Sequence, residues 1–323
     1  MNSLGAYTRN RILLSLFIIF AVSVFAFLIV HLMPGDPVRA VLGIEADEAA
    51  VQKMREELNL DKPFLTQYWL WMKGIFKGNF GRSLTLNTDV GELIGRRLPV
   101  TLSLTIPALI IAAIFGIIIG VICATNRGSI ADQLLTVLVT IANGVPIFWI
   151  GIMMIYLFGV LLGWLPLMGY ASPFESFVEY LRKAAMPVSI LAIRPMAEIA
   201  RQVRTNMLEV INQDYIRTAR AYGLSERKVK YKYALKNALI PIVTLLALQA
   251  RDVAGGSVLA EQVFSIAGMG QLIMISVLNR DFPVIQAIVL VITVIVVFVN
   301  LLLDISYGWL DPRIRMTARK VIN

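Results

Sequence analysis

Long runs of apolar residues, separated by short polar segments, dominate the chain. A helix rises about 1.5 Å per residue and a bilayer core is about 30 Å thick, so about 20 mostly apolar residues cross it. Six runs reach or nearly reach that length. The pattern therefore predicts an all-α membrane protein with six transmembrane helices, over Ile12–Met33, Pro99–Ala124, Leu134–Leu162, Ala184–Met207, Ala238–Ala260 and Phe282–Leu303.

The third run is the hardest to divide, because residues 134–170 carry no charge. This stretch is too long for one span and just short of two, and helix-breaking residues interrupt it at Asn143-Gly144-Val145-Pro146. Lys and Arg concentrate in cytoplasmic loops. Keeping one span here places 16 Lys and Arg inside against four acidic residues, whereas the outer segments hold 12 of each. We therefore predict a single span that is kinked near Pro146, with both termini cytoplasmic.

These spans imply four segments of chain. Residues 1–33 form a cytoplasmic N-terminus and the first transmembrane helix, and residues 34–98 form an extracytoplasmic segment with short amphipathic helices. A core of five transmembrane helices follows over 99–308, including a cytoplasmic loop at 206–238, and residues 309–323 form a cytoplasmic tail.

Composition agrees with a chain embedded in lipid and excludes several other classes. Hydrophobic residues make up 58% of the chain, and the mean hydropathy is +0.73. The net charge of +9 is spread between apolar runs, which is not the pattern of a nucleic-acid-binding domain. With one cysteine, one histidine and no Gly-x-x-x-x-Gly-Lys-Ser/Thr phosphate loop, we expect no catalytic residue, no metal site and no cofactor bound by this chain.

A short helix is predicted in the basic inner loop. Asp214 is typical of an N-cap and Gly223 of a helix stop. Tyr215, Ala219 and Tyr222 fall at i, i+4 and i+7, on one face. Small residues on that face would let the helix seat closely against another protein, and Ser225 begins a second, basic helix.

The same loop resembles that of a known family. The run Asp214-Tyr215-Ile216-Arg217-Thr218-Ala219-Arg220-Ala221-Tyr222-Gly223-Leu224-Ser225, followed by Ala234-Leu235-Lys236-Asn237-Ala238-Leu239-Ile240-Pro241, resembles the cytoplasmic loop of permease subunits of ABC importers for dipeptides, oligopeptides and nickel. The broader importer pattern begins Glu-Ala-Ala, where this chain has Arg217-Thr218-Ala219, but the glycine spacing is kept. The departures are common in the peptide and nickel branch.

The resemblance implies an importer-type ABC permease fold in a bacterial or archaeal plasma (inner) membrane. It implies the translocation-pathway subunit of an ATP-driven importer of di- or oligopeptides, or of nickel or other metal chelates. The implied partners are a second homologous permease subunit, two ATP-binding subunits or domains that hold ATP and Mg, an extracytoplasmic solute-binding protein and membrane lipid, with no nucleic acid. The coupling helix that receives the ATPase's movement would comprise Asp214, Tyr215, Arg217, Thr218, Ala219, Arg220, Ala221, Tyr222, Gly223 and Leu224.

Ionisable residues within the spans are candidates for the translocation path. Each costs about 2.5 to 3.5 kcal/mol at mid-bilayer, so they should face the bundle interior or water. Lining of the path and interhelical pairing stay open as interpretations. Arg194 and Glu198 can pair at i, i+4, and Glu261 is placed toward the outer interface. The candidates are Arg194, Glu198, Arg251, Asp252 and Glu261.

Two further features complete the expectations. Gly116-x-x-x-Gly120 and Gly255-Gly256 predict close packing between helices. An ion-gradient-driven secondary transporter is the alternative function, but it would favour paired broken helices in two related halves, which the sequence does not show.

Overall fold

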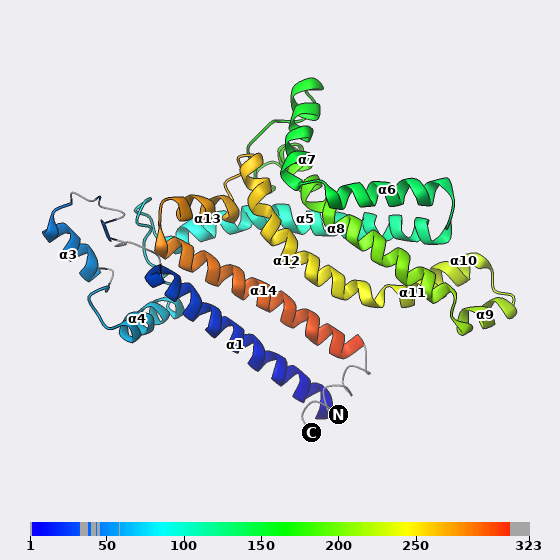
Figure 1. Ribbon diagram of the computed structural model, residues 1–323, viewed down its shortest axis with the longest axis horizontal. Helices are drawn as coiled ribbons and strands as arrows, with labels where there is room; N and C mark the ends of the chain where they lie inside the picture. Colours follow the sequence, from blue (N-terminus) through cyan, green and yellow to red (C-terminus); the bar gives the residue numbers. More distant parts are fainter. Residues whose placement is uncertain (1, 33–37, 40–42, 44–45, 58, 311–323) are drawn as a thin grey trace. The chain divides into compact units, whose positions relative to one another are not determined.

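In the computed structural model, the described residues 2–32, 38–39, 43, 46–57 and 59–310 are predominantly helical. A lone antiparallel bridge joins Arg82 and Asp89. The helices, shown in Figure 1, are α1 (Asn2–Leu32), α3 (Glu48–Glu57), α4 (Phe64–Phe76), α5 (Val90–Thr125), α6 (Ile130–Gly144), α7 (Ile147–Met154), α8 (Phe177–Ile211), α9 (Asp214–Ala221), α10 (Glu226–Lys228), α11 (Leu235–Ala238), α12 (Ile240–Val263), α13 (Met269–Leu278) and α14 (Phe282–Leu310), with π-helical turns η1 (Ile155–Leu161) and η2 (Val229–Ala234).

The chain divides into two compact units. The first combines Met1–Leu98 with Leu272–Asn323, and the second is Pro99–Gln271. In the first unit α1 and α14 run side by side (Figure 1). The aromatic α4 packs on α1, where Phe27 meets Tyr68 edge-on at 5.5 Å between ring centroids and Ser23 hydrogen-bonds the Tyr68 hydroxyl at 2.8 Å.

A buried carboxylate joins two distant stretches of the first unit. Asp281, which is 1% exposed, lies directly before α14. It accepts hydrogen bonds from the backbone N–H of Leu84 at 3.1 Å and from the hydroxyl of Thr85 at 2.6 Å. The Ser83 hydroxyl also donates to it. Residues 83–85 are therefore anchored to the start of α14 within the first unit.

The second unit is built around α8, against which α6, α7 and α12 pack. α5 approaches α8 very closely through two glycines. A Cβ at Gly116 would lie 2.8 Å from the Met196 carbonyl oxygen, and one at Gly120 would lie 2.6 Å from that of Ala200. The predicted close packing at these glycines is confirmed, whereas the same prediction is wrong for Gly255, which has no neighbouring atom within 4 Å. The surroundings of Gly256 lie outside the described part of the structure.

The third apolar run is broken where the sequence predicts a helix breaker. Ser129 caps α6 by accepting from the Asp132 N–H at 3.2 Å, and α6 ends at Gly144. α7 starts after Pro146, and the stretch formed by α7 and η1 is bent by 105° from α6. That angle is much sharper than the kink we expected within one span.

Three helical stretches of the described chain are long and apolar enough to cross a membrane. They are Thr8–Ile29, Val90–Thr125 and Phe282–Leu302, and the bent pair of α6 with α7 and η1 makes a fourth if it is one span. The predicted fourth and fifth spans coincide with the helices α8 and α12. Their helical structure is confirmed.

Candidate functional site

The predicted inner-loop helix forms as α9, with one correction at its start. Gln213 is the N-cap and makes no side-chain cap, so Asp214 belongs to the first turn and is not the cap itself. Gly223 ends the helix with φ +76°, a conformation that glycine adopts without a steric penalty. The Gly223 N–H donates to the Arg220 carbonyl at 2.9 Å, and the predicted stop is confirmed.

The orientation of α9 corrects the predicted docking face. Ile216 is 0% exposed and Ala219 8% exposed, because both pack into the core of the second unit. Ala219 therefore cannot lie on a surface offered to a partner. The outward surface, here called the α9 face, consists of Asp214, Tyr215, Arg217, Thr218, Ala221 and Tyr222. Small residues do occupy its centre, at Thr218 and Ala221.

Polar contacts hold α9 to the segment that follows it. Arg220 Nε donates to Glu226 Oε1 at 2.7 Å, and this hydrogen bond from a cation lowers the pKa of the exposed Glu226 carboxyl. The amide of Asn237 donates to the Tyr215 hydroxyl at 2.8 Å. The predicted basic helix after Ser225 is present as α10, η2 and α11, although the Ser225 side chain makes no cap.

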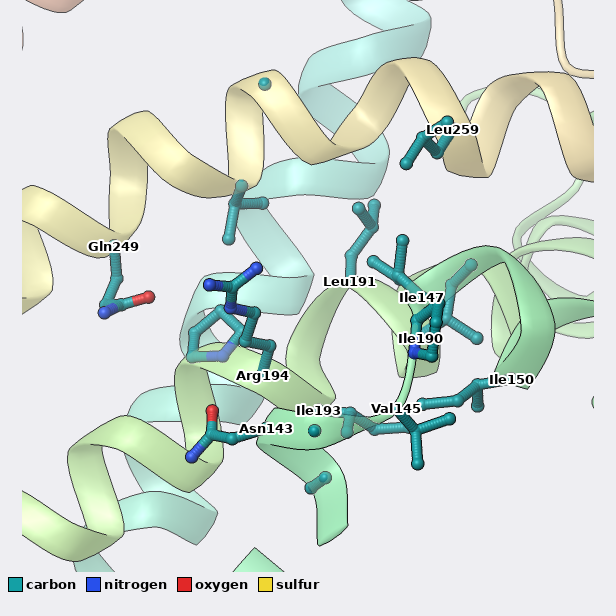
Figure 2. A pocket seen from close by; sticks show the side chains of 16 residues that line it. Asn143, Val145, Ile147, Ile150, Ile190, Leu191, Ile193, Arg194, Gln249 and Leu259 are labelled. Atoms are coloured by element: carbon teal, nitrogen blue, oxygen red, sulfur yellow. The ribbon is translucent and has the colours of Figure 1, made fainter. Parts of the chain in front are cut away.

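A cavity of about 620 Å³ opens in the same unit at the break between α6 and α7. Figure 2 shows its lining, to which α8 and α12 also contribute. Most lining side chains are apolar, including Ile147, Ile190, Leu191, Val253 and Leu259. The polar lining residues are Asn143, Arg194 and Gln249.

The predicted pair of Arg194 and Glu198 is present, and its arginine lines this cavity. Arg194 Nε lies 3.8 Å from Glu198 Oε1, and the other carboxylate oxygen accepts a 2.5 Å hydrogen bond from the Gln249 amide. The Arg194 side chain is 70% exposed. The side chains of Arg251 and Asp252 lie outside the described part of the structure, although their backbone belongs to α12.

Glu261, a predicted path residue, is buried in the described structure and lines no open cavity. It is 0% exposed, and its carboxylate accepts from the Thr101 hydroxyl at 2.7 Å and from the Gln271 N–H at 2.9 Å. The Met269 N–H donates to Thr101 Oγ1 at 2.8 Å. The carboxylate thus lies at the positive start of α13 and has a structural role.

One strong ion pair was missed by sequence reasoning. Arg204 on α8 contacts Asp132 on α6 through two hydrogen bonds, Nε to Oδ1 at 2.8 Å and Nη2 to Oδ2 at 2.9 Å. Asp132 is 4% exposed and also accepts from the Gly128 N–H at 3.1 Å. The partners are 72 positions apart, so no local spacing could signal the pair.

Comparison with known proteins places the chain among transport proteins. The family described as "Binding-protein-dependent transport system inner membrane component" matches residues 116–316, and its N-terminal companion matches residues 6–105. The "Probable peptide ABC transporter permease protein y4tP" of Sinorhizobium fredii is 36% identical over 97% of this chain and 100% of its own length. The "Dipeptide transport system permease protein DppB" of Alkalihalophilus pseudofirmus is 37% identical over 96% and 99%.

A solved structure supports the same fold. The inward-facing methionine ABC transporter MetNI contains a chain with a TM-score of 0.54 and 21% identity, which covers 66% of this chain and 93% of the solved one. At that identity the likeness establishes the fold alone.

Proposed function

Because this chain belongs to the family of binding-protein-dependent transport system inner membrane components, and is the permease component of an ATP-driven peptide ABC importer, we propose that α9 receives the ATPase's movement and that the α6–α7 cavity lies on the solute's path. The chain is a non-catalytic, multi-pass component of the bacterial inner membrane. The names of these two relatives refer to peptides, so the nickel alternative gains no specific support from them.

The proposed topology has six spans with both termini cytoplasmic. The excess of Lys and Arg over acidic residues on the proposed inner face supports it. α8 and α12 would supply the fourth and fifth spans, and the inward position of Glu261 and Gln249 fits helices buried within a bundle. The segment boundaries at 33, 98 and 308 follow from this topology.

The α9 face carries the coupling proposal. Ile216 and Ala219 pack α9 against the core, and the helix ends at Gly223. The opposite side of α9, the α9 face, therefore points away from the core. A protein groove can accept this surface because Thr218 and Ala221 are small, while Tyr215 and Tyr222 supply aromatic contact area at its edge. The proposed occupant is one of two ATP-binding subunits, which hold the ATP and Mg.

The remaining partners are inferred from the six proposed spans, which make up half of a translocation pathway in this fold. A second, similar permease subunit would complete the pathway, and an extracytoplasmic solute-binding protein would deliver the peptide. Of the candidate path residues, Arg194 lines the cavity and Glu198 pairs with it, and Arg251 and Asp252 stay as proposals made from the sequence. Glu261 is withdrawn from the path because it is fully buried.

A matched pair of substitutions tests the coupling proposal in the assembled transporter. Ala221→Glu places a carboxylate at the centre of the α9 face, and peptide uptake should fall about tenfold or more because burying an unpaired charge in an interface is costly. Ala131→Glu is the control, since Ala131 is an exposed alanine in the first turn of α6, where an acidic side chain is tolerated. Both variants should insert in normal amounts.

The same preparation distinguishes the energy source. Uptake should stop when ATP is depleted with the ion gradient intact. Uptake that survives depletion would show a gradient-driven transporter, and full uptake by Ala221→Glu would show that α9 is not the coupling element.

A further inference from the structure

We propose that the break between α6 and α7, together with Asn143 and Arg194, forms a subsite that binds a carboxylate group, as at the C-terminal end of a peptide. This inference rests on the proposed function, because it gives the chemistry of the cavity that we place on the solute's path. It adds a ligand group and an orientation that the function alone does not supply.

The first support is the start of α7. Helix N-terminal N–H groups attract anions, and discontinuous membrane helices present such ends to charged groups of a solute. α7 begins at Ile147 after Pro146, which makes no side-chain cap. Gly144, Val145, Pro146 and Ile147 all line the cavity. This helix end therefore opens onto the cavity and carries no side-chain oxygen of its own.

The second support is independent of the helix end. Both polar atoms of the Asn143 side chain, Nδ2 and Oδ1, are buried and make no hydrogen bond within the described structure. A buried amide without a partner is costly, so such groups in native proteins call for an explanation. Asn143 lines the cavity (Figure 2), and rotation of its side chain would let the buried NH₂ group donate to a carboxylate oxygen placed there.

The third support is Arg194, whose guanidinium makes only a long contact with its acidic partner. Glu198 is the acidic side chain paired with Arg194, at 3.8 Å, and its other oxygen is engaged by the Gln249 amide. The Arg194 guanidinium therefore keeps donors available, and its planar fork matches a carboxylate. Glu198 remains close enough to receive a cationic group, but the anion is favoured beside Asn143 and α7.

The rest of the cavity limits what the ligand can be. A volume of about 620 Å³ is within the range of small-ligand pockets, and the walls opposite Arg194 are aliphatic. These walls suit the side chains of a short peptide. A free inorganic anion would leave them uncovered.

The test uses cysteine labelling in the complete transporter. Leu259→Cys places a thiol on the cavity wall, and Cys123→Ala removes the natural thiol of this chain. N-acetyl-trialanine, which has a free carboxylate, should slow modification of the introduced thiol by a neutral maleimide, and N-acetyl-trialanine amide should not. The acetyl group removes the cationic end from both probes.

Substitutions then assign the effect. In this background Arg194→Gln should weaken protection by the acid about tenfold or more, because a charge-assisted pair is lost, and Asn143→Leu should weaken it about fivefold. Arg201→Gln removes an exposed arginine from the same helix away from the cavity and should change nothing.

Each outcome bears on the subsite separately from the function. Equal protection by acid and amide, no protection by either, or protection unaffected by Arg194→Gln and Asn143→Leu would overturn carboxylate recognition. ATP-dependent uptake of peptide by the same transporter would then leave the proposed function standing. Preferential protection by the acid without any peptide uptake would support the subsite and overturn the function.

Discussion

Two arginines of α8, ten residues apart, pair with carboxylates in ways that differ in distance, burial and the helix of the partner. Arg204 reaches another helix and makes two hydrogen bonds of 2.8 and 2.9 Å to the buried Asp132. Arg194 reaches one turn along its own helix to Glu198, at 3.8 Å, with 70% of its side chain exposed. The donors of Arg204 are used in hydrogen bonds within the chain, whereas those of Arg194 remain available at a cavity.

The difference separates structural polarity from functional polarity in this chain. A charge inside a membrane protein must be compensated, and Asp132, Glu261 and Asp281 are each compensated by several donors within a single unit. Within the described part of the chain, Arg194 is only weakly compensated and the Asn143 amide has no partner, and both residues line the same cavity. Incomplete compensation therefore marks the binding candidate better than the presence of charge does.

The largest effect on stability should come from the buried pair of Asp132 and Arg204. Asp132→Ala leaves Arg204 without its carboxylate, and we expect a loss of about 3 kcal/mol in the free energy of unfolding, because breaking a buried pair exposes the desolvation cost of the remaining charge. An SDS titration of the purified chain measures it. Asp132→Ala combined with Arg204→Met should recover part of the loss, and a loss below that of Arg194→Gln would reverse the comparison.

An intermediate effect is expected at Glu261. Glu261→Gln keeps one oxygen acceptor for Thr101 or Gln271 but removes the charge at the start of α13, so about 2 kcal/mol should be lost. The same titration, with Gln262→Glu as a control for charge placement next to it, gives the value. An unchanged midpoint would mean that the carboxylate is not held as described.

The smallest effect on stability, with the largest on transport, belongs to Arg194. Because the pair with Glu198 is long and the side chain largely exposed, Arg194→Gln should change stability by less than about 0.5 kcal/mol. Peptide uptake should nevertheless fall. A variant that unfolds easily and loses uptake only in proportion to its abundance would place Arg194 with the structural group.

Sequence reasoning succeeded where the information is local. The i, i+4 spacing of Arg194 and Glu198, the stop at Gly223, the breaker at Pro146 and the small residues at Gly116 and Gly120 each depend on a few neighbouring positions. Helix geometry converts such spacings into contacts directly. The family resemblance likewise rests on short local runs, such as Asp214–Ser225 and Ala234–Pro241.

The failures concern which neighbour covers a face. Nothing in the spacing of Tyr215, Ala219 and Tyr222 shows that Ile216 and Ala219 turn inward, because that depends on how η2 packs against α9. The burial of Glu261 could not be predicted, because its partner Thr101 is 160 positions away and gives no local signal. The angle of 105° at Pro146 likewise depends on how α7 packs on α8 and α12.

The close approach of α5 and α8 has a mechanical consequence. With a carbonyl oxygen 2.6 Å from where a Cβ at Gly120 would stand, the two backbones cannot slide along one another without collision. α8 ends at Ile211 and α9 begins at Asp214, so only Asn212 and Gln213 lie between them. In the proposed coupling, a displacement of α9 would pass through this short link to the end of α8, and α5 would follow because the two helices approach so closely at Gly116 and Gly120.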